Sequence, residues 1–139
     1  MDRAEKALLR HKNGYNCAQS VICTYAEELG IDERTAFRMA EGFGLGMGAM
    51  ETCGAVTAMA MAAGLKESDG NMSSPGTKKA SYKKAKAMIE EFKAKNGTII
   101  CREIKGVDTG KPVRSCDGCI EDAISIIDGS LLAENEGRL

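Results

Sequence analysis

The chain has 139 residues, 43% of them hydrophobic, and its 20 acidic and 19 basic side chains give a formal net charge of −1. So balanced a charge provides no general attraction to nucleic acid or to an anionic membrane surface. We therefore expect one domain spanning residues 1–139, with neither a nucleic-acid nor a membrane partner.

Three helices are predicted before residue 42. Residues 2–12 place their apolar side chains on one stripe, and Asn13-Gly14 ends that pattern. Asn16 is suited to cap a second helix from Cys17 to Leu29, which Gly30 would end. Asp32 is suited to cap a third helix that continues through Glu41.

The segment Gly42 to Leu65 is predicted to be the buried hub of the fold. Its 24 residues include one charged side chain, Glu51. The first part alternates glycine with larger apolar residues. The second part, from Met50 to Leu65, is apolar all round and consists mostly of small residues, which is typical of a helix at the centre of a bundle. Gly64 is expected to end this helix.

The rest of the chain is predicted to be helical with two polar loops. Thr77 is suited to cap a long helix to about Lys95, whose lysines we interpret as a solvated face. Residues 98–100 favour a strand but have no obvious partner. The remaining elements are a loop over 66–76, one helical turn over 101–105, a loop over 106–115 and a last helix over 117–132. The fold class is thus all-α, a compact bundle of about five helices around a buried central helix of small residues.

Six cysteines are the main chemical signal of the sequence. Residues 1–14 have no apolar core of the kind found in secretory signals, so we expect a cytoplasmic protein. In that compartment clustered cysteines indicate metal or redox chemistry more often than structural disulfides. The cysteines are Cys17, Cys23, Cys53, Cys101, Cys116 and Cys119.

Four of these cysteines fall at predicted helix starts. Cys17, Cys53 and Cys119 each lie in a predicted first turn, and Cys101 begins the short helical turn. The N-terminus of a helix carries partial positive charge, which lowers the pKa of a thiol and favours the thiolate. Our hypothesis is that these four ends converge on a pocket for soft anions or for a thiolate-bound metal.

Cys116-Asp117-Gly118-Cys119 forms a CxxC motif, which is typical of a redox dithiol or of half a metal site. The chain has one histidine, His11, so a zinc site of two cysteines and two histidines is excluded. Four thiolates would still suit zinc or an iron–sulfur cluster, and Cys116 is an alternative to Cys119 as a ligand. Cys23 lies about 240° around the helix from Cys17, so we expect it to have a packing role.

Other polar residues of the sequence are interpreted as structural. Gly44 to Ala49 fits G-x-G-x-x-A, but no βαβ pattern surrounds it, so we reject nucleotide binding. Glu51, inside the hub, is expected to stabilise a helix N-terminus. His11 is an acid–base candidate, although a lone histidine on a helix stripe is more often simply half-buried.

An ordered set of motifs along nearly the whole chain resembles the redox-active family named for its C_GCAxxG_C_C cysteine pattern. The motifs are GYNCAQSV at 14–21, GFGLGMG at 42–48, TCGAVTAMAMAAGL at 52–65, CREI at 101–104 and CIEDAISII at 119–127. The resemblance places the family cysteines at Cys17, Cys53, Cys101 and Cys119, with Cys116 as an alternative for the last. Leu45 interrupts the glycine run and is expected to narrow any pocket.

Two functions from different classes follow from these observations. The first is a redox protein whose cysteines Cys17, Cys53, Cys101 and Cys119 act by thiol–disulfide exchange or bind an iron–sulfur or other metal centre. The alternative is a non-enzymatic module in which four thiolates hold a structural zinc ion. The first function requires a redox partner of unassigned identity. A homodimer formed through the apolar hub is a further open alternative.

Overall fold

The computed structural model describes residues 1–132, which form an all-α fold and contain no β-sheet. This confirms the predicted fold class, although seven α-helices replace the expected five. They are α1 (Arg3–Lys12), α2 (Cys17–Tyr25), α3 (Glu33–Ala40), α4 (Gly54–Glu67), α5 (Lys78–Asn96), the single turn α6 (Cys101–Ile104) and α7 (Cys116–Ile127). Three shorter helical turns are η1 (Glu41–Phe43), η2 (Gly46–Met50) and η3 (Asp128–Leu132).

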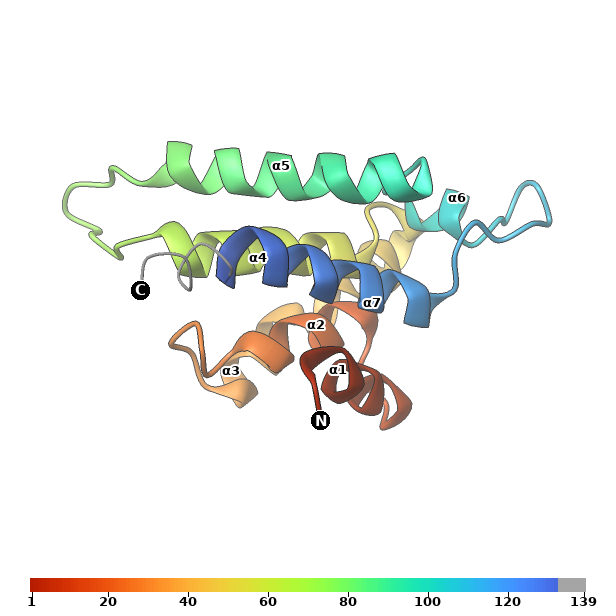
Figure 1. The fold of residues 1–139 in the computed structure, drawn as a ribbon, viewed down its shortest axis with the longest axis horizontal. Coiled ribbons are helices and arrows are strands. Elements are labelled where there is room, and N and C mark those ends of the chain that lie inside the picture. The colour runs from red at the N-terminus through yellow and green to blue at the C-terminus, as the bar shows by residue number, and fades with distance from the viewer. Residues whose placement is uncertain (133–139) are drawn as a thin grey trace.

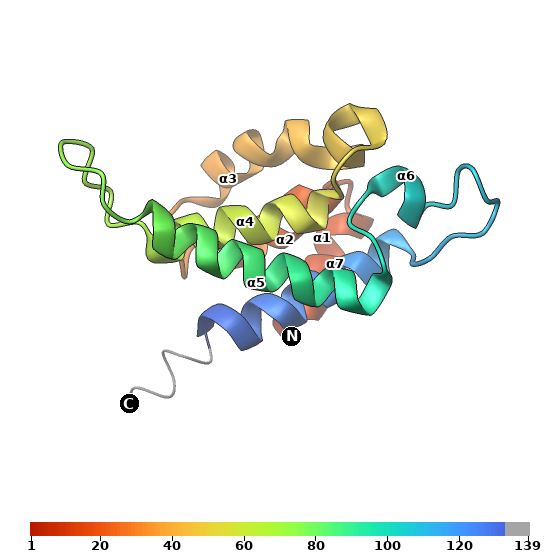
Figure 2. The same ribbon diagram turned by 90° about the horizontal axis from the view of Figure 1, so that it is seen from above.

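The helices are stacked around α4. In Figure 1, α5 lies above α4 and α7, while α1, α2 and α3 cover the opposite side. Seen from above, α4, α5 and α7 run side by side along the long axis (Figure 2). Helices α4, α6 and α7 begin at the same end of the molecule, next to the C-terminal end of α5. This arrangement gathers several helix N-termini in one place. Within residues 1–132, none of the helices is long and apolar enough to cross a membrane.

Capping side chains determine where several helices begin. Asp2, Asn16, Asp32 and Ser115 each accept a hydrogen bond from a backbone N–H in the first turn of the following helix. These bonds satisfy donors that have no partner inside the helix. Asn16 also forms a reciprocal capping box with Gln19. The caps predicted at Asn16 and Asp32 are therefore confirmed.

Helix α4 is the buried centre, as the sequence predicts. Most of its first ten residues are inaccessible to solvent, including Ala55, Val56, Ala58, Met59 and Ala62. Small side chains allow α2 and α5 to approach closely. At Gly54 an added Cβ would lie 3.0 Å from the Phe43 carbonyl oxygen and 3.1 Å from the Ala18 nitrogen. Gly54 therefore brings the start of α4 against the start of α2.

Several predicted boundaries of the helices were wrong. Helix α2 ends at Tyr25 rather than Leu29, and α4 continues past Gly64 to Glu67. Gly64 does not end the helix because its conformation is helical and no neighbour crowds it. Glu51 is exposed on the surface instead of lying inside the hub.

Residues 98–100 do have a partner. Ile100 forms an isolated antiparallel bridge with Thr52, a contact across the chain that local sequence patterns do not reveal. The Cys53 N–H donates to the Ile99 carbonyl at 2.8 Å, and the Cys101 N–H donates to the Glu51 carbonyl at 2.6 Å. These bonds hold the start of α6 beside the start of α4.

The start of α7 is held by a buried carboxylate. Asp122, with 1% of its side chain exposed, accepts hydrogen bonds from Arg114 and Asn96 and pairs with Lys95 at 2.7 Å. Two charged donors and one amide, from the end of α5 and from the loop before α7, compensate the cost of burying this group. The network fixes the loop before α7 and the end of α5 relative to α7, and thereby fixes the position of the CxxC motif.

Candidate cysteine site

Five of the six cysteines line one cavity of about 180 Å³ at the end of the molecule where α4, α6 and α7 begin. The five come from four helices that are distant in the sequence. The cavity is lined by His11, Asn16, Cys17, Leu45, Gly46, Cys53, Gly54, Cys101, Ile104, Lys105, Cys116 and Cys119. The structure thus brings all five cysteines of the predicted site together and leaves out Cys23.

The cysteines occupy the first positions of their helices. Cys17, Cys101 and Cys116 are the first residues of α2, α6 and α7, and Cys53 is the N-cap of α4. Cys119 lies one turn further along α7. The sequence predicted that α7 begins at about Asp117. The helix begins one residue earlier, at Cys116, because Ser115 is its N-cap.

The thiols form two pairs within the cavity. Cys17 and Cys116 share a side-chain hydrogen bond, and Cys53 and Cys119 share another. We call Cys17–Cys116 the outer pair, because both residues are partly exposed. We call Cys53–Cys119 the inner pair, because these residues are only 6% and 1% exposed. The two cysteines of the CxxC motif therefore belong to different pairs.

Cys116 is the most strongly activated thiol of the site. The hydrogen bond from Cys17 and the Lys105 ammonium group, whose Nζ lies 3.5 Å from the Cys116 sulfur, lower the pKa of Cys116 to about 5. The negative charge of Cys116 in turn raises the pKa of Lys105. Cys116 is therefore a thiolate at neutral pH, the form that attacks disulfides and binds metals.

Cys53 is activated mainly by its neighbours in the inner pair and in α4. The hydrogen bond from Cys119 lowers the pKa of Cys53 to about 7 despite its burial. The N–H groups of Ala55 and Val56 at the start of α4 also favour the thiolate, although neither forms a capping hydrogen bond to it. The inner pair thus contains a second thiol that ionises near neutral pH.

The other cavity thiols are held in the protonated form. Hydrogen bonding to Cys116 and then burial raise the pKa of Cys17, and the same two effects, with Cys53 as the partner, raise the pKa of Cys119. The pKa of Cys101 is also raised, and in this case burial is the main cause. Each pair therefore combines one thiol of lowered pKa with one of raised pKa, and Cys101 belongs to neither pair.

A strained segment covers one side of the cavity. Four consecutive residues, Leu45 to Gly48, have φ between 53° and 70°. For Leu45 and Met47 this left-handed conformation costs about 1–2 kcal/mol per residue. At Gly46 an added Cβ would lie 2.5 Å from the Glu51 nitrogen and 2.9 Å from the Cβ of Cys101. The glycine therefore allows the segment to close over Cys101.

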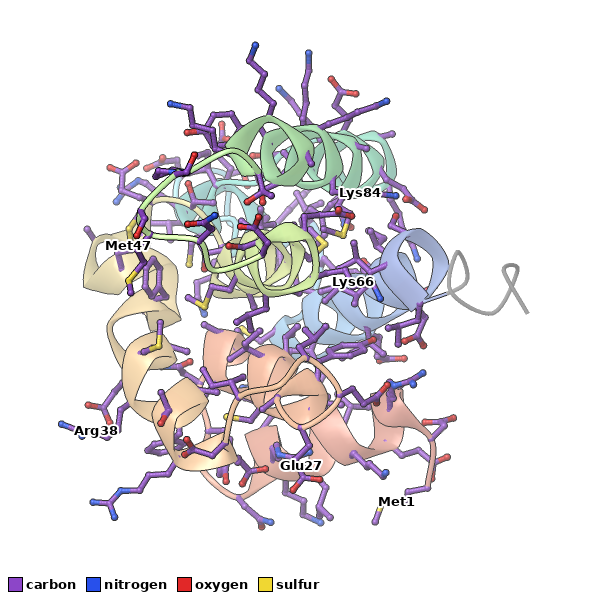
Figure 3. All side chains as sticks on the ribbon, turned by 90° about the vertical axis from the view of Figure 1, so that its left-hand side faces the viewer. Met1, Glu27, Arg38, Met47, Lys66 and Lys84 are labelled. Atoms are coloured by element: carbon purple, nitrogen blue, oxygen red, sulfur yellow. The ribbon has the colours of Figure 1, made fainter. Side chains whose placement is uncertain are left out.

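The same segment departs from the predicted buried hub. Leu45 lines the cavity, yet it is 48% exposed, and Met47 is 46% exposed. Met47 lies at the outer edge of the molecule in Figure 3. The glycine-rich part of the predicted hub therefore lies at the surface beside the cavity. Of the two parts of the hub, α4 is the one that belongs to the core.

His11 belongs to this site although sequence reasoning discounted it. Its Nδ1 lies 2.8 Å from Asp117 Oδ1, so the end of α1 is joined to the start of α7 beside Cys116. His11 also contributes to lowering the pKa of Cys116. Its place on the apolar stripe of α1 was a weak signal, because His11 and Asp117 are 106 positions apart in the sequence.

Cys23 lies outside the site, buried in α2 with its sulfur 3.7 Å from the Glu33 carbonyl oxygen. This position agrees with a packing role.

The described sulfurs are paired rather than arranged around a metal position. Among residues 1–132, no group of three or more His, Cys, Asp or Glu side chains has the arrangement needed to hold a metal ion. All six cysteines are free thiols. An iron–sulfur cluster or a zinc ion at Cys17, Cys53, Cys101, Cys116 or Cys119 stays a prediction, and it requires the thiols to leave the described pairs.

Comparison with known proteins agrees with the motifs of the sequence. The family described as "Putative redox-active protein (C_GCAxxG_C_C)" matches residues 15–129. This range contains every cysteine of the cavity. No curated protein and no solved structure shows significant similarity to the chain.

Proposed function

The chain belongs to the C_GCAxxG_C_C family of redox-active proteins, and from this premise we propose that it reduces disulfide bonds through the outer pair, Cys17 and Cys116. One observation supports this proposal above the others. At the partly exposed side of the cavity, a thiolate, Cys116, lies in direct contact with a protonated thiol, Cys17. A nucleophile with an adjacent second thiol is the arrangement that disulfide exchange requires.

The reaction starts with attack by the Cys116 thiolate on one sulfur of a substrate disulfide, R–S–S–R. A bond forms between Cys116 and that sulfur, and the other sulfur leaves as a thiolate that takes up a proton. Cys17 then loses its proton and attacks the Cys116 sulfur, which releases the second substrate thiol. The net change is R–S–S–R plus two protein thiols to two R–SH plus one Cys17–Cys116 disulfide, a transfer of two electrons.

Other residues of the cavity support the two steps. Lys105 stabilises the Cys116 thiolate before attack and again when Cys116 acts as a leaving group. A cellular dithiol would return the outer pair to its reduced state. We place the reaction in the cytoplasm, where thiols are kept reduced.

Trapping of the mixed disulfide tests this proposal. With oxidised glutathione as the substrate at pH 6, Cys17→Ser should accumulate a glutathione adduct on Cys116, detected by intact mass and peptide mapping. Cys116→Ser should form such an adduct on Cys17 much more slowly, because no activated thiolate remains in the outer pair. Cys23→Ser, a buried thiol outside the site, is the matched control and should behave as the parent protein. Equal rates in Cys116→Ser and in the parent protein would overturn the proposal.

Metal content measured on protein purified without oxygen tests the alternative predictions. Iron with acid-labile sulfide would favour a cluster on these cysteines, and one zinc per chain would favour the structural module. Either result would mean that the cysteines of the site bind a metal centre instead of exchanging disulfides.

A further inference from the structure

We propose that Cys53 and Cys119 form a second, internal dithiol that takes over the disulfide from Cys17–Cys116, so that one chain reduces two substrate disulfides before it needs an external reductant. This inference rests on the function proposed above and assigns the inner pair to the same reaction.

The first support is the position of the two pairs. All four sulfurs border one cavity, and each pair is in direct contact within itself. The pairs also lie next to each other, because Gly54 packs the start of α4 onto the start of α2 at Ala18. Cys53 directly precedes Gly54 and Cys17 directly precedes Ala18, so this contact holds the two cysteines on facing helix ends.

The second support is the difference in exposure. Cys17 and Cys116 are partly exposed, whereas Cys119 is 1% exposed. A protein or peptide disulfide therefore reaches the outer pair first, and the inner pair is accessible only to sulfur already inside the cavity. Burial of the inner pair is what an internal acceptor of the disulfide requires, since it prevents exchange with other thiols.

The transfer balances without any other reactant. The Cys53 thiolate attacks the Cys17 sulfur of the outer disulfide, which forms Cys53–Cys17 and expels the Cys116 thiolate. Cys119 then attacks the Cys53 sulfur, which forms Cys53–Cys119 and expels Cys17, and the proton lost by Cys119 is taken up by Cys17. Two electrons pass from the inner to the outer pair, so Cys17 and Cys116 can react again.

The direction of the first attack follows from leaving-group chemistry. A thiol of low pKa leaves a disulfide faster than one of high pKa. Lys105, 3.5 Å from the Cys116 sulfur, stabilises the departing thiolate of Cys116. Attack on Cys17 is therefore favoured over attack on Cys116, which agrees with the close packing of Cys53 against the start of α2.

Time-resolved disulfide mapping tests the proposal on the full chain. Fully reduced protein is mixed with one equivalent of oxidised glutathione, quenched with acid after increasing times, alkylated, and mapped by peptide mass spectrometry. We expect Cys17–Cys116 to appear first and Cys53–Cys119 to replace it. In Cys119→Ser the transfer should stop at its first step, so the Cys53–Cys17 disulfide should appear beside the outer disulfide and Cys17 should not return to a thiol. Cys23→Ser should retain the order of the parent protein.

The outcomes separate this inference from the proposed function. If the Cys17–Cys116 disulfide forms and Cys53 and Cys119 stay alkylated at all times in the parent protein, the internal transfer is refuted while the outer reaction stands. If no Cys17–Cys116 disulfide forms at any time, both proposals fail. The mapping of the parent protein is decisive by itself, so the test does not depend on the folding of Cys119→Ser. Cys53→Ala removes the attacking thiolate, so in this second variant the outer disulfide should persist at least about ten times longer than in the parent protein, until glutathione reverses it.

Discussion

The outer and inner pairs differ although they share the same helix and the same cavity. Cys116 and Cys119 lie one turn apart at the start of α7, yet the pKa of Cys116 is lowered and that of Cys119 is raised. Cys116 accepts a hydrogen bond from Cys17 and lies beside Lys105, whereas Cys119 donates to Cys53. A position at a helix start is therefore not enough to favour a thiolate, because the pKa values of Cys17, Cys101 and Cys119 are raised although all three lie at helix starts. The hydrogen-bond partner of each thiol decides which member of a pair ionises.

This comparison also changes the meaning of the CxxC motif in this chain. In a redox motif of that spacing the two cysteines form a disulfide with each other. Here each of them contacts a cysteine from another helix, at the start of α2 or at α4. The motif therefore distributes one thiol to each pair, and under the proposed transfer a reduced chain would supply four electrons rather than two.

Removal of the thiolate of the outer pair should have the largest effect. At pH 6, Cys116→Ser is expected to lower the rate of exchange with oxidised glutathione about 100-fold, because the remaining thiols of the site are buried or protonated. In Cys119→Ser the rate of the first exchange step should stay within about twofold of the rate in the parent protein. Both rates are measured by quenching the reactions with acid at increasing times and determining the products by mass spectrometry. Equal losses in the two variants would remove the distinction between the pairs.

A side chain at Gly54 should separate the two pairs. Gly54→Ala introduces a Cβ 3.0 Å from the Phe43 carbonyl oxygen, so we expect a loss of about 2 kcal/mol in the free energy of unfolding. Gly64→Ala in the same helix is the matched control. No atom lies within 4 Å of its added Cβ, and it should gain up to about 1 kcal/mol from helix propensity. Urea unfolding measures the free energy of unfolding of both variants. If Gly54→Ala left this free energy unchanged, the helices would be able to shift apart without cost.

Loss of the cation beside the outer pair should change its pH dependence. The rate of Cys116 alkylation should fall as pH decreases through the pKa of Cys116, about 5 in the parent protein, because protonation removes the thiolate. Lys105→Met should raise this pKa and lower the rate at pH 5.5 about fivefold, with no change at pH 9, where the thiolate is complete in both proteins. Lys111→Met, on the exposed loop before α7, is the control. An unchanged profile in Lys105→Met would mean that Cys17 alone sustains the thiolate.

His11 is expected to have the smallest effect. Its positive charge, when present, adds to the stabilisation of the Cys116 thiolate. His11→Asn should therefore lower the alkylation rate of Cys116 about twofold at pH 5.5. Lys12→Gln, exposed on the same turn of α1, serves as the control. An unchanged alkylation rate in His11→Asn would indicate a purely structural contact with Asp117.

The sequence by itself determined the helices and the chemical character of the site. Asn16 and Asp32 mark helix starts because their side chains satisfy N–H groups of the next turn, a local effect. The small apolar residues of α4 identify the central helix because nothing polar needs to reach water. The cysteines at helix starts and the ordered motifs likewise led to the family without any knowledge of the fold.

Only the tertiary structure decided which thiols meet and which of them has a lowered pKa. The pairs Cys17–Cys116 and Cys53–Cys119 join helices far apart in the sequence, and their contact depends on the packing of α2 and α7 around α4. Lys105 and His11 carry no motif, and they act on Cys116 because of the positions of α6 and α1. Hydrogen bonds and charges act over a few ångströms of space, so distance along the chain does not reveal them.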